Sequence, residues 1–308
     1  MNILIFGGCG FIGSNIADFM MRQGHKVTIV DNLSRPNVVK NLMWLISNHN
    51  FKFLQYDVRD WDRIKNIVED TKADVIFHFA AQVGVTTSIE DPRHDFKVNA
   101  GGTFNVLESA RLSGRKPHII FASTNKVYGD FETHSPVNES QPLSFCTPYG
   151  CSKGAAEQYV LDYNRVYGIP TTVLRMSCIY GERQYGSEDQ GWLAHFVWSK
   201  IKGKPITIYG DGSQVRDTLY ISDYVDLCNR LITDKVTGIF NVGGGDFQTS
   251  VLDAIKNIGN EYTFSDWRPS DQKYYVSDIT KVKKIGWEPK VSTEEGLERL
   301  KVWAQNQK

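Results

Sequence analysis

Several features that mark particular protein classes are scarce or missing in this sequence. Its 308 residues include no apolar stretch approaching the roughly 18 that a membrane span needs. Lysine plus arginine and aspartate plus glutamate number 35 each, so the basic surplus typical of nucleic-acid-binding proteins is missing. We therefore expect neither a nucleic acid nor a membrane as a partner.

Cysteine is also sparse, with five residues: Cys9, Cys146, Cys151, Cys178 and Cys228. Their odd number and scattered positions argue against a disulfide framework and favour a reducing, cytoplasmic location. No second pair of Cys or His lies at metal-site spacing from Cys146 and Cys151, so no metal site is expected.

The first two thirds of the chain alternate short apolar runs with longer amphipathic segments. Apolar strands joined by helix-length crossovers predict a parallel sheet with helices on both faces, which is an α/β, doubly wound Rossmann fold. The predicted strands are residues 2–6, 26–30, 51–56, 75–79, 118–122 and 171–175. The predicted helices are residues 12–23, 60–70, 100–113 and 148–167.

Beyond about residue 176 this alternation weakens, because glycine and proline become denser and the strand-like runs become shorter. We expect residues 1–176 to form the Rossmann domain, with some later segments returning to it. Residues 177–308 are expected to form a smaller second domain built from loops, helices and a few strands.

A glycine-rich loop separates the first predicted strand from the first predicted helix. Gly7, Gly10 and Gly13 form the pattern G-x-x-G-x-x-G. Residues without a Cβ allow a pyrophosphate to approach the backbone, and the helix N-terminus supplies free N–H groups. The loop, with Phe11 and Ile12, is therefore predicted to bind a dinucleotide. A glycine turn that only tightens helix–strand packing is the alternative.

The second predicted strand ends at Asp31, eighteen residues after Gly13. A carboxylate at this place meets the adenosine ribose 2′-hydroxyl and repels a 2′-phosphate, so NAD is favoured over NADP. Asn32 follows directly and is assigned to the same site. Arg35 weakens this preference where it faces the cofactor, and a solvated Arg35 is the alternative.

Two further strand ends complete the predicted cofactor site. Asp57, beside Val58, follows the third strand and can accept a hydrogen bond from the adenine amino group. Capping of the next helix is the alternative for Asp57. Ala80, Ala81 and Gln82 follow the fourth strand, where small side chains let a dinucleotide lie across the sheet edge.

Tyr149 and Lys153 lie four residues apart, behind Thr147 and Pro148, which suit the first positions of a helix. Both side chains then project from one helix face. Lowering the pKa of a phenol from about 10 to about 7 requires about 4 kcal/mol. An ammonium group ~4 Å away supplies roughly that amount at an effective dielectric near 20. Beside an oxidised nicotinamide, the pair is predicted to accept the proton of an alcohol. A solvated helix face is the alternative.

Thr124 supplies a hydroxyl at another strand end. Residues 118–122 form a predicted strand that leads into STNKVYG. The carboxyl ends of strands line the ligand crevice in this architecture, so Thr124 is predicted to contact the reacting oxygen. An ST-turn that ends the strand is compatible with that role.

These motifs together resemble the extended short-chain dehydrogenase/reductase superfamily, and within it the nucleotide-sugar epimerases and dehydratases. The similarity covers essentially the whole chain, including GGCGFIG, HFAAQ, KVNAGGTFNVLE, STNKVYG and YGCSK. The resemblance implies that Tyr149 is the base, that Lys153 binds the ribose and tunes the tyrosine, and that Thr124 contacts the sugar. Asn99 matches a residue that supports the cofactor and active-site region. It also implies tightly bound NAD, regenerated in each turnover, and a homodimer formed through helices near 100–113 and 149–167.

The same resemblance assigns substrate contacts to residues 177–308, which are expected to bind the nucleotide sugar. Tyr209 matches an aromatic residue that stacks on the base, and Arg216 and Arg268 match residues that clamp the diphosphate. Two planar, permanently charged forks suit a diphosphate. Ordinary salt bridges to neighbouring aspartates are the alternative for either arginine. Ser177, which replaces an Asn common in sugar 4-epimerases, is included among the substrate contacts.

Asn125 and Lys126 follow Thr124, where similar sugar 4,6-dehydratases have an Asp-Glu pair. Elimination would lack its acid and base, so dehydration is disfavoured. STNKVYG and GERQYGSEDQGWLAHF are most similar to the CDP-paratose 2-epimerases, which implies C2 epimerisation of a CDP-sugar for polysaccharide biosynthesis. A UDP-sugar 4-epimerase is the alternative reaction. A catalytically inactive NAD-binding regulator is the alternative from another class.

Overall fold

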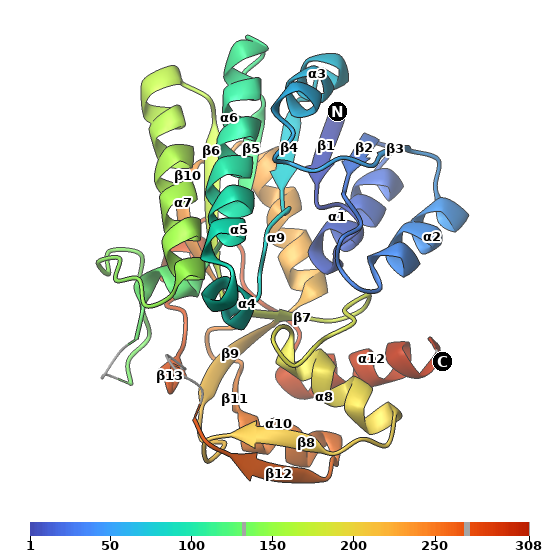
Figure 1. Ribbon diagram of the computed structural model, residues 1–308, viewed down its shortest axis with the longest axis vertical. Helices are drawn as coiled ribbons and strands as arrows, with labels where there is room; N and C mark the ends of the chain where they lie inside the picture. The colour runs from blue at the N-terminus through green and yellow to red at the C-terminus, as the bar shows by residue number, and fades with distance from the viewer. Residues whose placement is uncertain (131–133, 268–271, 308) are drawn as a thin grey trace. The chain divides into compact units, whose positions relative to one another are not determined.

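The computed structural model describes residues 1–130, 134–267 and 272–307, so Arg268 lies outside the described residues. The chain forms two compact units (Figure 1). Unit 1 comprises Met1–Ser123, Pro148–Leu174 and Val225–Ile239. Unit 2 comprises Thr124–Thr147, Arg175–Tyr224 and Phe240–Lys308. The sequence prediction places the boundary at residue 176 and lets some later segments return to the first domain. In the structure, Val225–Ile239 belongs to unit 1 and Thr124–Thr147 belongs to unit 2.

A seven-stranded sheet forms the centre of the Rossmann architecture, with the strand order β10-β6-β5-β4-β1-β2-β3. Its strands are β1 (Asn2–Phe6), β2 (Lys26–Val30), β3 (Lys52–Leu54), β4 (Val75–His78), β5 (His118–Thr124), β6 (Thr171–Met176) and β10 (Gly238–Val242). β1 pairs in parallel with both β2 and β4, so the strand order reverses beside β1. Ligands bind at such a reversal in doubly wound sheets, and the predicted fold class is confirmed.

The helices of the Rossmann part lie on both faces of this sheet (Figure 1). α3 packs on α6 and α6 packs on α7, whereas α1 packs on α2. β1 is buried along nearly its whole length because helices cover both faces, which explains its continuous apolar sequence. The helices are α1 (Phe11–Arg22), α2 (Val38–Asn48), α3 (Trp61–Thr71), α4 (Val85–Glu90), α5 (Pro92–Phe96), α6 (Gly102–Leu112), α7 (Pro148–Tyr167) and α9 (Ile221–Thr233).

Two predicted elements differ most clearly from the structure. The third strand spans only Lys52–Leu54 rather than residues 51–56. The helix expected at 100–113 is preceded by one wide turn, η1 (Lys97–Gly101), with π-type hydrogen bonding, and α6 begins at Gly102. π-type turns inside helical segments are often found at functional sites, and this one carries Asn99.

Unit 2 contains smaller sheets. β9 (Val215–Tyr220) pairs with β7 (Cys178–Tyr180), β11 (Gln248–Ser250) and β13 (Tyr274–Tyr275), while β8 (Ile206–Tyr209) pairs with β12 (Tyr262–Ser265). The other elements are η2 (Asn125–Tyr128), α8 (Trp192–Ile201), α10 (Val251–Ile258), α11 (Thr280–Lys283) and α12 (Thr293–Gln305). α8 packs against α10 and α12, which cover the sheets of this unit.

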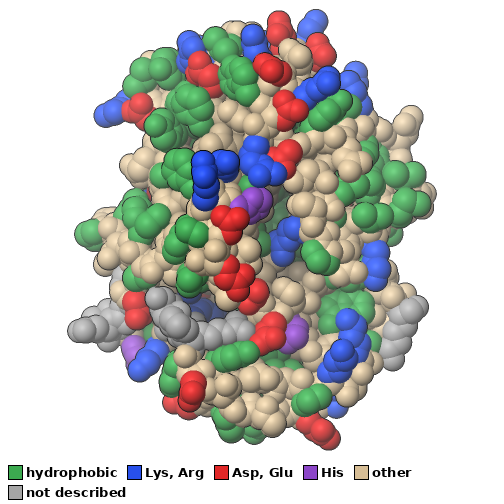
Figure 2. All heavy atoms as spheres, viewed as in Figure 1, with side chains coloured by type: hydrophobic (Ala, Val, Ile, Leu, Met, Phe, Trp, Pro, Cys, Tyr) green, Lys and Arg blue, Asp and Glu red, His purple; other side chains and the backbone are tan. Residues whose placement is uncertain are grey.

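Charged side chains of both signs are interspersed over the face of the molecule shown in Figure 2. This distribution agrees with the formal net charge of zero. Within the described ranges of the chain, no helix is long and apolar enough to cross a membrane.

Candidate active site

The glycine loop between β1 and α1 has two tightly packed glycines and one open one. A Cβ at Gly7, whose φ is 77°, would lie 2.6 Å from the backbone nitrogen of Ala80. A Cβ at Gly13 would lie 2.2 Å from the carbonyl oxygen of Gly7. A Cβ at Gly10 would meet only that carbonyl oxygen, at 3.2 Å, among the described non-neighbouring atoms within 4 Å. Packing therefore accounts for Gly7 and Gly13, whereas Gly10 leaves the loop open to a ligand.

Gly10 is also the N-cap residue of α1, and it provides no side-chain cap. The first N–H groups of a helix lack intrahelical partners, so those of Phe11, Ile12 and Gly13 suit an anionic group. The open loop and the helix N-terminus together fit a pyrophosphate.

Asp31 lies at the end of β2, beside the glycine loop. Its carboxylate accepts hydrogen bonds from the backbone N–H groups of Cys9, at 3.0 Å, and Leu33, at 2.9 Å. Burial raises the pKa of Asp31, and these two bonds together with the charge of Arg35 oppose that rise. A carboxylate oxygen can accept more than one hydrogen bond, so this geometry fixes Asp31 while leaving capacity for a ribose hydroxyl.

Asp57 lies in an ionic cluster. Its oxygens accept bonds from Arg59 Nε at 2.8 Å, Arg59 Nη2 at 2.9 Å and Asn32 Nδ2 at 2.8 Å. The Arg59 hydrogen bonds are the main cause that lowers the pKa of Asp57 to about 2. Asp60 caps α3 by accepting from the backbone N–H of Arg63, so capping of α3 by Asp57, the alternative interpretation, is wrong. Val58 is buried in the core of unit 1.

The segment after β4 is fixed to the π-type turn η1. Gln82 N donates to Asn99 Oδ1 at 2.9 Å, and Asn99 Nδ2 donates to Gln82 O at 3.0 Å. Ala80 lies against the glycine loop through Gly7, and Ala81 stands between Ala80 and Gln82. Asn99 therefore holds in place the strand end predicted to lie under the dinucleotide.

Tyr149 and Lys153 lie one turn apart on α7, which begins at Pro148. Tyr149 is half-buried, and its backbone N–H donates to Ser88 Oγ at 3.2 Å. Lys153 is only 3% exposed. A fully solvated helix face, the alternative interpretation of this pair, is therefore wrong.

Burial is the main cause that lowers the pKa of Lys153, to about 7, and the charges of Asp95 and Glu157 oppose that shift. Burial, assisted by the charge of Lys153, lowers the pKa of the neighbouring His78 to about 3. The imidazole of His78 is therefore neutral at physiological pH. Of His78 and Lys153, only the Lys153 amine titrates near neutrality. The site places an amine that titrates near neutrality on the same helix face as a phenol.

Asp95, Glu157 and Ser123 were not singled out by the sequence interpretation. All three are buried, and Ser123 Oγ donates to Glu157 Oε2 at 2.7 Å. For Glu157, the signal in the sequence was the spacing of four residues that continues from Tyr149 through Lys153 to Glu157. Two fully buried acidic residues close to a buried lysine are unusual, because charged side chains are rarely found in a protein core.

Thr124 belongs to unit 2, whereas Tyr149 and Lys153 belong to unit 1. Thr124 ends β5, and its Oγ1 accepts from the backbone N–H of Lys126 at 3.2 Å, which forms the expected cap after the strand. Lys126 Nζ donates to Gln272 Oε1 at 3.0 Å. Asn125 Nδ2 lies 3.5 Å from the same oxygen. Gln272 therefore joins the two residues that stand in place of an Asp-Glu pair.

The remaining substrate residues lie in unit 2. Arg216 is buried, its Nη1 donates to the carbonyl oxygen of Val215 at 2.8 Å, and its Nη2 donates to that of Gln272. Ser177 donates to the buried carboxylate of Asp217, a structural contact. The half-buried Tyr209 donates its hydroxyl hydrogen to Glu188.

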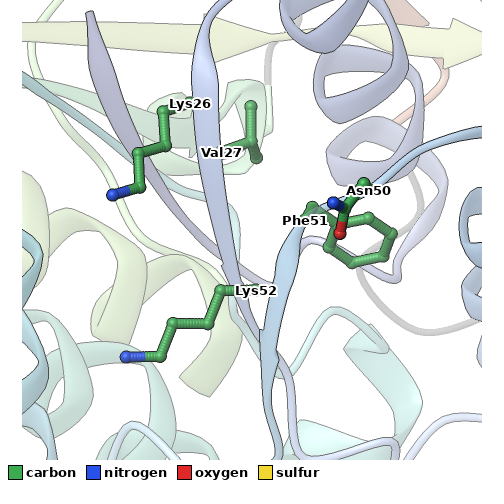
Figure 3. A pocket seen from close by; sticks show the side chains of 5 residues that line it. All are labelled: Lys26, Val27, Asn50, Phe51 and Lys52. Atoms are coloured by element: carbon green, nitrogen blue, oxygen red, sulfur yellow. The ribbon is translucent and has the colours of Figure 1, made fainter.

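A surface pocket beside β2 and β3 is separate from these residues (Figure 3). It is lined by Lys26, Val27, Asn50, Phe51 and Lys52. Lys26 and Lys52 are the first residues of their strands, whereas ligands in doubly wound folds bind at the carboxyl ends. The pocket therefore plays no part in the candidate site.

The comparison with known protein families decides the classification. The model of the NAD dependent epimerase/dehydratase family matches residues 3–243. The chain belongs to this family. Its cofactor is accordingly NAD, and the open glycine loop and the Asp31 carboxylate fit the pyrophosphate and the ribose of this cofactor. The resemblance noted in the sequence is confirmed.

Individual relatives are similar over almost their whole length. A CDP-paratose 2-epimerase of Salmonella typhi is 41% identical, and the match covers 98% of this chain and 99% of the relative. The crystal structure of UDP-glucose 4-epimerase from Thermotoga maritima with UDP-glucose has 34% identity and a TM-score of 0.91, covering 100% and 99% of the two chains. A Thermus thermophilus UDP-glucose 4-epimerase in complex with NAD has 32% identity and a TM-score of 0.89, covering 98% of each chain.

Proposed function

We propose that this member of the nucleotide-sugar epimerase/dehydratase family epimerises a CDP-sugar at C2 through a transient keto sugar, a reaction of the CDP-paratose to CDP-tyvelose type. The observation that carries an epimerase mechanism is the Tyr149–Lys153 pair on α7, with the amine buried. The 41% identity to a CDP-paratose 2-epimerase over nearly the full chain supports the choice of substrate.

Bound NAD supplies a hydride acceptor and, in the second half of the reaction, a hydride donor. In the proposed mechanism, Tyr149 removes the proton of the C2 hydroxyl and returns it after the sugar has presented its other face. The Lys153 ammonium stabilises the phenolate form of Tyr149. The Thr124 hydroxyl donates a hydrogen bond to the reacting oxygen.

In this proposal, Arg216 holds the diphosphate while the keto sugar turns. Retention of the diphosphate prevents loss of the intermediate between the two half-reactions. Arg268 is proposed to act with Arg216. A guanidinium group suits this task because its charge and planar donors match a phosphate.

Dehydration is disfavoured by the side chains that follow Thr124. Asn125 and Lys126 contact Gln272 and provide no carboxylate to remove a proton next to a keto group. A family member with this segment is therefore expected to leave every hydroxyl of the sugar in place.

A UDP-sugar 4-epimerase is the second candidate function. It is favoured by the two solved UDP-glucose 4-epimerases at 34% and 32% identity. The same Tyr149, Lys153 and Thr124 would serve, with C4 in place of C2 at the nicotinamide.

The test is a panel of CDP-, UDP- and GDP-sugars incubated with the protein and NAD and followed by NMR. A new C2 epimer from the CDP-sugar is expected, whereas a C4 epimer from a UDP-sugar would support the second candidate. A CDP-sugar deuterated at C2, incubated in ordinary water, tests the mechanism. The label is expected to stay on C2, and full exchange with solvent would indicate enolisation instead.

We also propose that the protein is a homodimer formed through α6 and α7. Phe104 is 40% exposed and Tyr159 is 49% exposed, although both are aromatic. Their rings meet edge to face at 5.6 Å between centroids, across the two helices. Exposed aromatic residues clustered in this way are typical of protein interfaces.

A further inference from the structure

Two carboxylates share the buried surroundings of Lys153. Asp95 on α5 and Glu157 on α7 are both fully buried. Glu157 lies one helical turn beyond Lys153, as Tyr149 lies one turn before it. We propose that Asp95 and Glu157 are positioning residues that keep Lys153 in its ammonium form and thereby set the pH range in which Tyr149 works. This inference rests on the proposed roles of Tyr149 and Lys153.

Each carboxylate is held by a donor from another element. Asn99 Nδ2, from η1, donates to Asp95 Oδ1 at 3.0 Å. Ser123 Oγ, from β5, donates to Glu157 Oε2 at 2.7 Å. These hydrogen bonds hold the two carboxylates at fixed positions in the core.

The other groups around Lys153 do not stabilise a positive charge as strongly. The Phe121 ring, from β5, has its centroid 4.2 Å from Lys153 Nζ. His78, from β4, is kept neutral because burial and the Lys153 charge lower its pKa to about 3. Tyr149, on α7, is neutral until it gives up its proton. Burial raises the pKa of Asp95, and the hydrogen bond from Ser152 and the charge of Lys153 oppose that rise.

A buried ammonium loses its proton unless opposite charges compensate for desolvation. Desolvation lowers the pKa of Lys153 to about 7. The charges of Asp95 and Glu157 oppose this shift, and the effect of Asp95 is the larger. With either carboxylate made neutral, Lys153 would be uncharged at neutral pH. The phenol of Tyr149 would then lose one of the cations that favour its ionisation, and Arg35, whose charge also interacts with Tyr149, would remain.

The first test is the pH profile of epimerisation by Asp95→Asn and Glu157→Gln. Both substitutions keep an oxygen for the Asn99 or Ser123 bond and remove only the charge. We expect the acid limb of the kcat profile to move up by about one pH unit or more, with KM for the sugar changed by less than about threefold. The matched control is Asp91→Asn at the N-cap of α5, where Asp91 accepts from the His94 N–H. An unmoved acid limb in both variants would overturn the proposal.

The second test measures stability without NAD or substrate, so it does not depend on the proposed reaction. Lys153→Met is introduced into the wild-type protein and into Asp95→Asn, and urea unfolding is followed at about pH 6. Because the ammonium keeps only one of its two counter-charges in Asp95→Asn, Lys153→Met should change the urea midpoint more favourably in that background than in wild type. Equal changes in the two backgrounds would contradict the proposal.

Failure to fold is also informative. If Asp95→Asn does not fold, the double variant with Lys153→Met should fold, and its failure to do so would count against the proposal. An inactive wild-type enzyme with a clear coupling in the stability cycle would refute only the proposed reaction. An active enzyme without that coupling would refute only the role of the carboxylates.

Discussion

The ammonium nitrogen of Lys153 lies 4.2 Å from the centroid of the Phe121 ring, inside the core of unit 1. This contact shows that the lysine of the Tyr149–Lys153 pair is part of the protein interior. A charge in this position interacts strongly with neighbouring groups because little water screens it. The chemistry proposed for Tyr149 depends on that environment.

Lys153 should make stability depend on pH. Burial lowers its pKa from 10.5 to about 7, so between these values the unfolded chain binds a proton that the folded protein does not. The free energy of unfolding contributed by this group therefore rises with pH through that window. We expect Lys153→Met to remove this contribution, so that the stability of the variant relative to wild type falls as pH rises from about 7 to 10. Urea unfolding of both proteins at several pH values measures this difference in stability. A difference that does not change with pH would contradict the prediction.

Two glycines of the loop, Gly13 and Gly10, should differ in how much their replacement by alanine lowers the stability of the protein. Gly13→Ala places a Cβ 2.2 Å from the Gly7 carbonyl oxygen, so it should cost more than about 2 kcal/mol of stability. Gly10→Ala meets that oxygen at 3.2 Å and should cost less than about 1 kcal/mol.

Calorimetric titration then separates folding from cofactor binding. Gly10→Ala should weaken NAD binding about tenfold or more, because the added methyl group occupies the open side of the loop. A folded Gly10→Ala protein with normal NAD affinity would show that the pyrophosphate binds elsewhere.

Asp31→Asn should reduce the preference for NAD over NADP. The amide keeps an oxygen for the Cys9 and Leu33 N–H groups but removes the charge that repels a 2′-phosphate. We expect the NADP/NAD ratio of dissociation constants to fall about tenfold. Asp60→Asn, which retains a helix-capping side chain, is the control and should leave the ratio unchanged.

Tyr159→Lys should separate the proposed dimer into monomers. Tyr159 is exposed on α7, where a charge would face the partner's apolar surface. Light scattering after size-exclusion chromatography measures the mass. Met43→Lys on α2, an exposed apolar position in a helix outside the proposed interface, is the control. A wild-type monomer, or a Tyr159→Lys dimer, would refute the proposed interface.

Much of the Rossmann part could be predicted because local patterns determine it. The apolar run of β1, the glycine loop and Asp31 at the end of β2 are signals within about thirty residues. The end of β3 and the start of α6 were less accurate, because hydrogen bonding to neighbouring elements sets these boundaries. The return of Val225–Ile239 to unit 1 has no local signal in the sequence.

The candidate site was predicted less completely than the fold. Tyr149 and Lys153 stand in a recognisable spacing, but Asp95 lies more than fifty residues earlier in the chain. Only the packing of α5 against α7 brings Asp95 into the surroundings of Lys153. The role expected for Arg268 lies outside the described residues and stays a prediction.

The most direct measurement of the proposed function compares wild-type protein with Tyr149→Phe in the conversion of a CDP-sugar to its C2 epimer by NMR. The control is Tyr159→Phe, which removes a hydroxyl from an exposed tyrosine on the same helix. We expect the wild type and the control to form the epimer, and Tyr149→Phe to be slower by about 10² or more while still binding NAD. Equal rates in Tyr149→Phe and wild type, or no epimer from any CDP-sugar with the wild type, would contradict the proposal.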